Sequence, residues 1–414
     1  MLRYYFLIVF CCLQLSRGFT QSRNLDYFIQ TTIDNSPLLK DYQNQIMSLR
    51  VDSMLLKASM LTQVKFISND SYAPVIKGWG YDEAISNIAN INGLFQASRN
   101  YYTPKNISLQ YKAIALQRQG LLDTILLSRQ DLLRTVTDQY ITAYGDQLAV
   151  EFNKEIFDLM EGEEAALKKL AQASVFKQTD YLAFVVTMQQ QELIFLQARN
   201  QYRTDYFTLN YMAGLLDTTE HRLSPPQLPG LTSNDLYGSV FYKKFVTDSL
   251  RIVNEKALLS YEYKPKLGAY ADAGYTSSLQ TTPYKNLGFS AGVSLSIPIY
   301  DGHQRRMKEQ QIGLKESTRI NNRDFYVTQY AMQRVQMQRQ IADIDMLVTK
   351  INKQIEYAHT LITANGKLLQ TGDITVKDYS LAINNYLNAK NLLTLNTVSR
   401  LKILGQASYW NIKP

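Results

Sequence analysis

The side chains that could carry out chemistry in this chain are few and widely separated. The three histidines, His221, His303 and His359, form no clustered metal-ligand motif. The sequence contains no phosphate-binding loop of the G-x-x-x-x-G-K-[ST] type, no dinucleotide-binding G-x-G-x-x-G motif and no H-E-x-x-H zinc motif. The two cysteines, Cys11 and Cys12, are adjacent and lie near the N-terminus. The sequence therefore predicts no enzyme activity, no cofactor and no metal site.

Two carboxylates occupy matching positions in an internal repeat. Asp180-Tyr181 matches Asp378-Tyr379, and Lys169–Gln172 matches Lys367–Gln370, each pair 198 residues apart. Tyr102 and Tyr300, at the ends of the two predicted second strands, are also 198 residues apart. An unchanged offset at two well-separated places indicates a duplicated unit. Each aspartate precedes an apolar-periodic stretch, where aspartate is a preferred N-cap residue, so both are predicted to cap the start of a helix.

The repeat predicts the order of the elements that position these aspartates. Each copy reads as a helix, two strands, a long helix, a turn and a further helix. The predicted parts are a signal peptide at 1–20, a first repeat at 21–222, a connector at 223–236 and a second repeat at 237–414. The predicted strands lie at 62–72, 90–102, 267–275 and 288–299, and the interhelical turns lie at 173–179 and 371–377.

Residues 1–20 have the pattern of a secretory signal peptide. Arg3 supplies a positive start, and Tyr4–Leu15 form an apolar core that is too short to span a membrane as a helix. Large residues precede Cys11, which disfavours a lipid anchor at that position. Once the signal is removed the mature chain has no cysteine, which excludes disulfide scaffolds and cysteine-based metal or redox sites.

The composition is that of an ordinary folded protein of 414 residues. Charged residues make up 19% and hydrophobic residues 45%, which excludes a disordered chain. The net charge is +8, but lysine and arginine are mixed with acidic residues and form no basic block, so nucleic-acid binding is not predicted. No segment after the signal has 18 uncharged apolar residues in a row, so no membrane-spanning helix is expected.

The strand predicted at 288–299 alternates between apolar and small, mostly polar residues. A period of two places the apolar side chains on one face of the strand and the serines and Gly292 on the other. Asp301-Gly302 then gives a turn before the next helix. The apolar positions are Phe289, Ala291, Val293, Leu295, Ile297 and Ile299.

The second long helix has a coiled-coil pattern. Its apolar residues recur at alternating spacings of three and four residues. Each long helix could run for roughly 65 residues, or about 100 Å, which predicts a rod or one stave of a helical tube. The heptad positions are Ile341, Ile344, Val348, Ile351, Ile355, Ala358 and Ile362.

Over essentially the whole chain after the signal, these features resemble the TolC family of outer-membrane efflux proteins. Leu295–Gly302, followed by Arg305-Arg306, is similar to the family's strand-to-helix signature. Gly372–Thr375 and the duplicated Asp-Tyr helix start are similar to the family's periplasmic interhelical turns.

The resemblance implies a mainly α fold with a membrane β part. In a homotrimer, each protomer would give four strands to one twelve-stranded outer-membrane β-barrel and its long coiled-coil helices to a periplasmic α-barrel. The apolar residues of the 288–299 strand would face outer-membrane lipid, and the opposite face would line a wet lumen. The implied location is the outer membrane of a Gram-negative bacterium, with a periplasmic extension.

The function implied by the resemblance is a passive exit channel of a tripartite efflux or type I secretion system. It would conduct small molecules or exported proteins from the periplasm to the exterior, docked to a periplasmic adaptor protein and an inner-membrane pump of the RND or ABC type. Two alternatives stay open: an exported coiled-coil scaffold without a pore, and a dedicated metal-ion efflux duct of the same fold. The lipid-facing stripe disfavours the scaffold, and the lack of a methionine or histidine ladder disfavours the metal duct.

The resemblance also assigns a periplasmic gate to Asp180 and Asp378. In a trimer, a ring of like carboxylates near the axis would favour cations and repel anions. The capping role and the gate role are compatible. Leu381 stands where the family has a second aspartate, which argues against a strong cation-binding gate.

The two interhelical turns are the predicted contact for the adaptor. Gly372 allows a tight turn, and Ile374 is expected to present an exposed apolar side chain. The alternative is that these are ordinary turn residues that pack on their own helices. The predicted contact residues are Val175, Phe176, Gly372, Asp373, Ile374 and Thr375.

Overall fold

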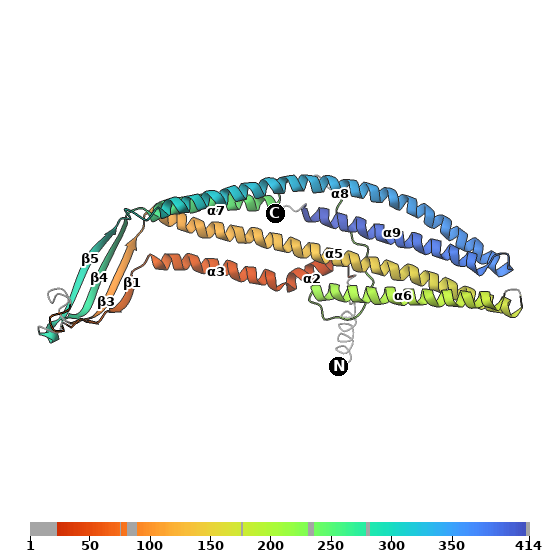
Figure 1. The fold of residues 1–414 in the computed structure, drawn as a ribbon, viewed down its shortest axis with the longest axis horizontal. Helices are drawn as coiled ribbons and strands as arrows, with labels where there is room; N and C mark the ends of the chain where they lie inside the picture. The colour runs from red at the N-terminus through yellow and green to blue at the C-terminus, as the bar shows by residue number, and fades with distance from the viewer. Residues whose placement is uncertain are drawn as a thin grey trace, which may run out of the picture. The chain divides into compact units, whose positions relative to one another are not determined.

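The computed structural model describes residues 23–74, 76–80, 89–174, 177–230, 236–278 and 282–410. The predicted signal peptide at 1–20, with Cys11 and Cys12, lies outside the described residues, and so do Val175 and Phe176 of the first turn. Figure 1 traces the described elements along the chain.

The helices account for most of the described chain. α5 spans 69 residues and α8 spans 68, and each is followed after a short turn by a 35-residue helix. Ser36 separates α2 from α3 because the residue before a proline, here Pro37, avoids helical backbone. The helices are α2 (Leu25–Asn35), α3 (Pro37–Ser59), α5 (Pro104–Gln172), α6 (Gln178–Met212), α7 (Val240–Glu262), α8 (Gln304–Thr371) and α9 (Val376–Trp410), with a short 3₁₀ helix at Pro283–Lys285.

The strands form one antiparallel sheet in the order β1-β3-β4-β5, and the two-residue β2 also pairs with β3. β3 and β4 come from different halves of the sequence, so the pairing at the centre of the sheet joins the two halves. The strands are β1 (Gln63–Ser68), β2 (Ser71–Tyr72), β3 (Ala89–Tyr101), β4 (Lys266–Ser277) and β5 (Leu287–Ser296).

The chain divides into two compact units, and each unit combines segments from both halves of the sequence. The first unit consists of the described residues of Met1–Leu39, Leu126–Ser239 and Thr328–Pro414, and it contains both interhelical turns. The second consists of those of Lys40–Ile125 and Val240–Val327, and it contains the sheet.

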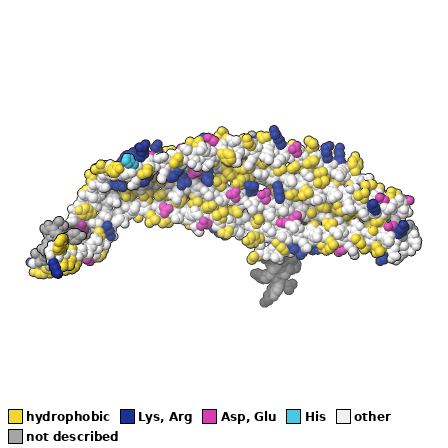
Figure 2. All heavy atoms as spheres, viewed as in Figure 1, with side chains coloured by type: hydrophobic (Ala, Val, Ile, Leu, Met, Phe, Trp, Pro, Cys, Tyr) yellow, Lys and Arg dark blue, Asp and Glu magenta, His cyan; other side chains and the backbone are white. Residues whose placement is uncertain are grey.

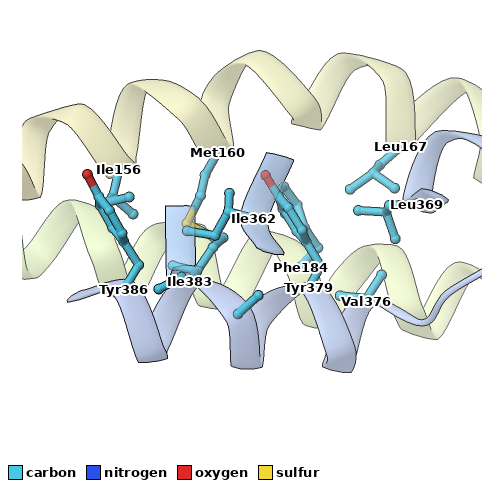
Figure 3. Close-up of a cluster of buried hydrophobic side chains, with 12 residues drawn as sticks. Ile156, Met160, Leu167, Phe184, Ile362, Leu369, Val376, Tyr379, Ile383 and Tyr386 are labelled. Atoms are coloured by element: carbon cyan, nitrogen blue, oxygen red, sulfur yellow. The ribbon is translucent and has the colours of Figure 1, made fainter. Parts of the chain in front are cut away.

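The first unit has a core where α5, α6, α8 and α9 meet near the interhelical turns. Ile156, Met160 and Leu167 of α5 point toward Tyr379 and the other labelled residues of α9 (Figure 3). Burying such side chains is favourable by about 25 cal/mol for each Å² of apolar surface removed from water. The cluster comprises Ile156, Met160, Leu167, Phe184, Ala358, Ile362, Leu369, Val376, Tyr379, Ala382, Ile383 and Tyr386.

The heptad predicted in α8 matches its buried face. From Ile341 to Ile362, all seven heptad positions are buried or half-buried, and every residue between them is exposed. Ile351, Ala358 and Ile362 are the most buried of the seven. The spacing of three and four residues therefore identified the face of α8 that packs within the first unit.

The strand predicted at 288–299 ends earlier than the sequence pattern indicates. β5 ends at Ser296, so the assignment of Ile297 and Ile299 to the strand was wrong. Pro298 explains the difference, because proline has no backbone N–H to donate to a neighbouring strand.

Candidate functional site

One face of the sheet is apolar and open in the single chain. Figure 2 shows hydrophobic side chains on the surface of the strand region, and Phe289 is 90% exposed. Phe66 of β1 and Phe95 of β3 are paired on this face, with their ring centroids 5.1 Å apart. An exposed apolar surface of this kind marks a region that contacts lipid or protein. Its members in β5 include the predicted residues Phe289, Ala291, Val293 and Leu295.

The opposite face of the sheet is mostly polar, although it also carries the paired residues Ile67 and Leu94. In β5 this face carries Gly288, Ser290 and Gly292, and the Ser290 hydroxyl donates to Asp272 Oδ1 of β4 at 2.8 Å. Gly288–Gly292 also matches the G-x-S-x-G pattern of serine hydrolases. A nucleophilic serine of that type occupies a sharp turn between a strand and a helix, whereas Ser290 lies in the middle of β5. The match is therefore part of an ordinary strand.

The α8–α9 turn is closed by backbone bonds at the end of α8. The Gly372 N–H donates to the Leu369 carbonyl at 3.2 Å, and the Asp373 N–H donates to the Leu368 carbonyl at 2.9 Å. These two bonds define a Schellman motif, which needs a left-handed residue at its centre. Gly372 has φ +83°, a backbone conformation that glycine adopts without steric cost.

The same turn is closed on its other side by a capping box. The Asp378 N–H donates to Thr375 Oγ1 at 3.3 Å, and Asp378 Oδ2 accepts from the Thr375 N–H at 3.2 Å and from its hydroxyl at 2.7 Å. These hydrogen bonds from Thr375, first its hydroxyl and then its N–H, lower the pKa of Asp378 below its usual range. Thr375 and Asp378 thus satisfy backbone donors at the start of α9.

Among the described residues of the α5–α6 turn, the Ser174 N–H donates to the Ala171 carbonyl at 3.1 Å, the equivalent of the Gly372 bond. Ser174 has φ +61°, so a residue with a Cβ holds the left-handed position that Gly372 holds in the other turn. Within the described residues, Lys177 is the N-cap of α6 and makes no side-chain capping bond. Lysine offers no acceptor, so it cannot accept from the first N–H groups of α6.

Asp180 and Asp378 lie at equivalent places in the first turns of α6 and α9. Neither is the N-cap residue that the sequence predicted, because Lys177 and Thr375 hold those positions and each aspartate comes three residues later. Asp180 is half-buried and Asp378 is exposed. Leu381, at the position where the family has a second aspartate, is 60% exposed.

The predicted adaptor residues of the second turn differ in exposure. Asp373 and Thr375 are exposed, and the Asp373 carboxylate accepts from the Thr371 hydroxyl at 2.6 Å. Ile374 is half-buried and packs against the core cluster of the first unit, so the expectation of an exposed apolar side chain there was wrong. Ile374 follows the alternative, a turn residue that packs on its own helices.

Three glutamates of α5 make polar contacts near the turns that the sequence did not indicate. Gln370 Nε2 of α8 donates to Glu163 at 3.0 Å, the Tyr386 hydroxyl of α9 donates to Glu155 at 3.0 Å, and the Tyr181 hydroxyl of α6 donates to Glu164. A groove of about 480 Å³ runs beside the first two of these contacts and includes His359 and Gly366 in its lining. The four helices are therefore joined by hydrogen bonds as well as by the apolar cluster.

Tyr379 is a fully buried residue of the same region. Its ring is 6.4 Å from that of Phe184 and nearly parallel to it, and its hydroxyl has no hydrogen-bond partner within the described part of the chain. Burial, and to a smaller extent the nearby Glu163 carboxylate, raises the pKa of Tyr379 to about 12. Its repeat counterpart Tyr181 is half-buried and bonded to Glu164.

The described residues hold no cluster of three or more histidine, cysteine or acidic side chains that could bind a metal ion. His359 instead lies against the ring of Tyr386, with ring centroids 5.9 Å apart, and His303 lies against Tyr300. Across the ranges that the structure describes, no helix combines the length and apolar character that a membrane crossing requires.

Solved structures of outer-membrane channels are similar to this chain. CusC, described in terms of transmembrane channel formation, has a TM-score of 0.73 at 10% identity, covering 95% of this chain and 94% of its own. The MtrE channel of Neisseria gonorrhoeae in its open state has a TM-score of 0.71 at 12% identity, covering 93% and 88%. VceC of Vibrio cholerae has a TM-score of 0.68 at 12% identity, covering 94% and 96%.

No family model and no curated protein matches the sequence. At identities of 10–12%, the structural likeness establishes the fold, and it does so over nearly the full length of both chains. The fold predicted from the sequence resemblance is therefore confirmed: the chain has the TolC-type fold of outer-membrane channels, with long paired helices and four principal strands.

Proposed function

We propose that this chain is the outer-membrane exit channel of a tripartite efflux or type I secretion system in a Gram-negative bacterium. It conducts small molecules or exported proteins from the periplasm to the exterior. The observation that carries this proposal is the sheet, which has an exposed apolar face, an opposite polar face and two open edges. A coiled-coil scaffold without a pore would not require a sheet with one apolar face, one polar face and open edges.

The open edges support a homotrimer. Within the described residues, β1 pairs only with β3, and β5 pairs only with β4. In hydrocarbon an unpaired strand edge leaves backbone N–H and C=O groups without partners, at a cost of several kcal/mol for each group. Joining β5 of one copy to β1 of the next satisfies both edges, and three copies give one twelve-stranded barrel.

In this proposal the interhelical turns form the periplasmic end of the channel. Asp180 and Asp378 lie at the gate, and Asp373 and Thr375 are exposed where a periplasmic adaptor would dock. The chain acts passively, and an inner-membrane pump of the RND or ABC type supplies the energy. Similar solved structures are described as channels, which supports a role without catalysis.

The test is the mass and conductance of the protein extracted from outer membranes. A detergent-stable trimer of three 47.5 kDa chains that opens ion channels in planar bilayers is the expected result. A monomer without channel activity would support the scaffold instead.

The gate role has its own test. The double variant Asp180→Ala/Asp378→Ala is expected to raise single-channel conductance, because it removes six carboxylates per trimer from the constriction. Asp158→Ala, which removes an exposed carboxylate bonded to Lys154 on α5, serves as the control and leaves conductance unchanged. Thr375→Ala removes the capping partner but keeps the Asp378 charge. If Thr375→Ala raised conductance as much as the double variant, helix capping rather than charge would be the cause.

A further inference from the structure

The charged residues of the sheet are few, and all but one lie on the polar face. Among the described strand residues, four are charged: Lys65 in β1, Arg99 in β3, and Lys266 and Asp272 in β4. The register places Arg99 opposite Ala269, on the apolar face with Phe95. Lys65, Lys266 and Asp272 share the polar face, because residues opposite one another or two apart along a strand lie on the same side.

Lys65 and Asp272 lie in one row that crosses all four principal strands. Lys65 is opposite Gln96, Gln96 is opposite Asp272, and Asp272 is opposite Ser290. Neighbouring strands are about 4.8 Å apart, so the backbones of Lys65 and Asp272 are separated by about 10 Å along this row. The Lys65 side chain is exposed, and Asp272 is half-buried and accepts from Ser290.

The third charge of the polar face is well separated from this row. Lys266 is six residues from Asp272 along β4, or about 20 Å at 3.4 Å per residue. The next row toward the loops, Ile67, Leu94, Gly274 and Gly288, contains no charged residue. Among the described strand residues, Lys65 and Asp272 are therefore the charged residues of the polar face at this level of the sheet.

We propose that Lys65 and Asp272 form a mixed-charge ring in the lumen of the barrel and set its preference between cations and anions. This inference rests on the proposed function, because three copies are needed to close the sheet. Closure would place three lysines and three aspartates on one circuit, alternating in sign. The opposite charges offset each other, so the ring lets solutes of either sign pass.

The physical basis of the ring is long-range electrostatics in a narrow aqueous pore. At about 0.01 M salt the Debye length is about 30 Å, so a net charge on the ring acts across the lumen. At about 1 M salt the Debye length is about 3 Å, and the same charge acts only on ions that touch it. Rings of charged side chains set ion preference in other pores by this effect.

The test measures reversal potentials of trimeric channels in planar bilayers across a potassium chloride gradient. Lys65→Gln leaves three carboxylates and is expected to raise the potassium-to-chloride permeability ratio by about twofold or more at low salt. Asp272→Asn leaves three lysines and should lower the ratio by a similar factor. The double variant should return to the wild-type ratio, and each shift should shrink at about 1 M salt.

Arg99→Gln is the matched control. It removes the same charge from the same sheet, but on the apolar face, where Arg99 lies over the ring of Tyr101 at 5.7 Å. It should leave the permeability ratio unchanged. If Lys65→Gln and Asp272→Asn moved the ratio in the same direction, or not at all, the ring would be ruled out while the channel itself remained.

Cysteine labelling tests the ring without a conductance measurement. Both natural cysteines lie in the first 20 residues, so an introduced cysteine can be followed separately. In outer membranes, Lys65→Cys and Asp272→Cys should react with a membrane-impermeant maleimide, and Val64→Cys and Val293→Cys should be protected. Labelling at 64 and 293 with protection at 65 and 272 would overturn the ring. A wild-type protein that forms neither trimers nor channels would instead overturn the proposed function.

Discussion

The two interhelical turns occupy equivalent places in the sequence, yet they are stabilised differently. The second has Gly372 at its left-handed position and a Thr375–Asp378 capping box, whereas the first has Ser174 and Lys177 at the corresponding positions. α6 and α9 nevertheless have the same length and start 198 residues apart. Among the described residues, the same path of the chain thus has a side-chain cap in the second turn and none at Lys177 in the first.

The core cluster explains how the first turn keeps its form. Leu167 and Phe184, which flank that turn, are buried in the same cluster as Leu369 and Val376, which flank the second. Apolar packing can fix the ends of two helices even where a cap is missing, because most helical stability in proteins comes from packing. The two turns therefore share one apolar core and differ in their local capping.

The largest expected difference between the turns concerns their tyrosines. Tyr379→Ala should lower the free energy of unfolding by about 3–5 kcal/mol, because it empties a fully buried site. Tyr181→Ala should cost about 1 kcal/mol or less, because Tyr181 is only half-buried. Denaturant unfolding followed by hydrogen exchange of the turn peptides measures both. Tyr379→Phe, which removes only the unpartnered hydroxyl, is the control and should be nearly neutral; equal losses for the two alanine variants would contradict the comparison.

The left-handed positions should respond in opposite directions to substitution. Gly372→Ala is expected to cost about 1 kcal/mol, because a Cβ is strained at positive φ. Ser174→Gly should gain about 0.5 kcal/mol, since relief of that strain exceeds the extra freedom of glycine in the unfolded chain. Hydrogen-exchange rates of the amides on either side of each turn report these changes. A destabilised Ser174→Gly variant would show that Ser174 is not strained.

Exchanging the capping residues tests whether the cap causes the difference between the two helix starts. Thr375→Val keeps the shape of the side chain but removes the hydroxyl, and it should destabilise the start of α9 by about 1 kcal/mol. Lys177→Thr places a capping residue three positions before Asp180 and should stabilise the start of α6 by about 0.5 kcal/mol. Amide exchange in the first turn of each helix is the measurement. No gain in Lys177→Thr would mean that packing alone determines the start of α6.

The smallest effect is a difference in pH dependence. Hydrogen bonds from Thr375 lower the pKa of Asp378, so their stabilisation is present above the ordinary aspartate value and is lost as the pH falls through the lowered value. The difference in local opening between wild type and Thr375→Val should therefore shrink as the pH falls below about 4. A difference that did not change with pH would show that the Asp378 carboxylate plays no part in the cap.

Most of the fold could be predicted because its signals are local. Heptad spacing identified the packed face of α8, and the alternation from Phe289 to Leu295 identified the apolar face of β5. The end of β5 was misplaced because the alternation continues past Ser296, although Pro298 cannot donate to a sheet. The N-cap of α9 was misplaced by three residues, because threonine and aspartate both favour that position and Thr375 and Asp378 compete for it. In α6 the position is held by Lys177, which no capping preference indicates.

The sites were less predictable because they depend on contacts between distant residues. Glu163 and Gln370 are 207 residues apart, and no spacing in the sequence indicates their contact. The row from Lys65 to Ser290 depends on the register between strands from both halves, which only the paired sheet determines. Ile374 was expected to be exposed because a turn residue usually is, and its partial burial follows from its packing against the core cluster.

The regular heptad of α8 also determines the handedness of its packing. An ideal helix drifts by about 20° for each heptad, so a stripe kept at seven-residue spacing from Ile341 to Ile362 winds around the helix as a left-handed path. For its neighbours to follow that path, α8 must supercoil with them to the left. A single inserted residue after Ile351 would rotate every later heptad position by about 100° and turn Ala358 and Ile362 away from the core. The regular seven-residue spacing, more than any single contact, therefore keeps the apolar face at the end of α8 directed toward the core beside the α8–α9 turn.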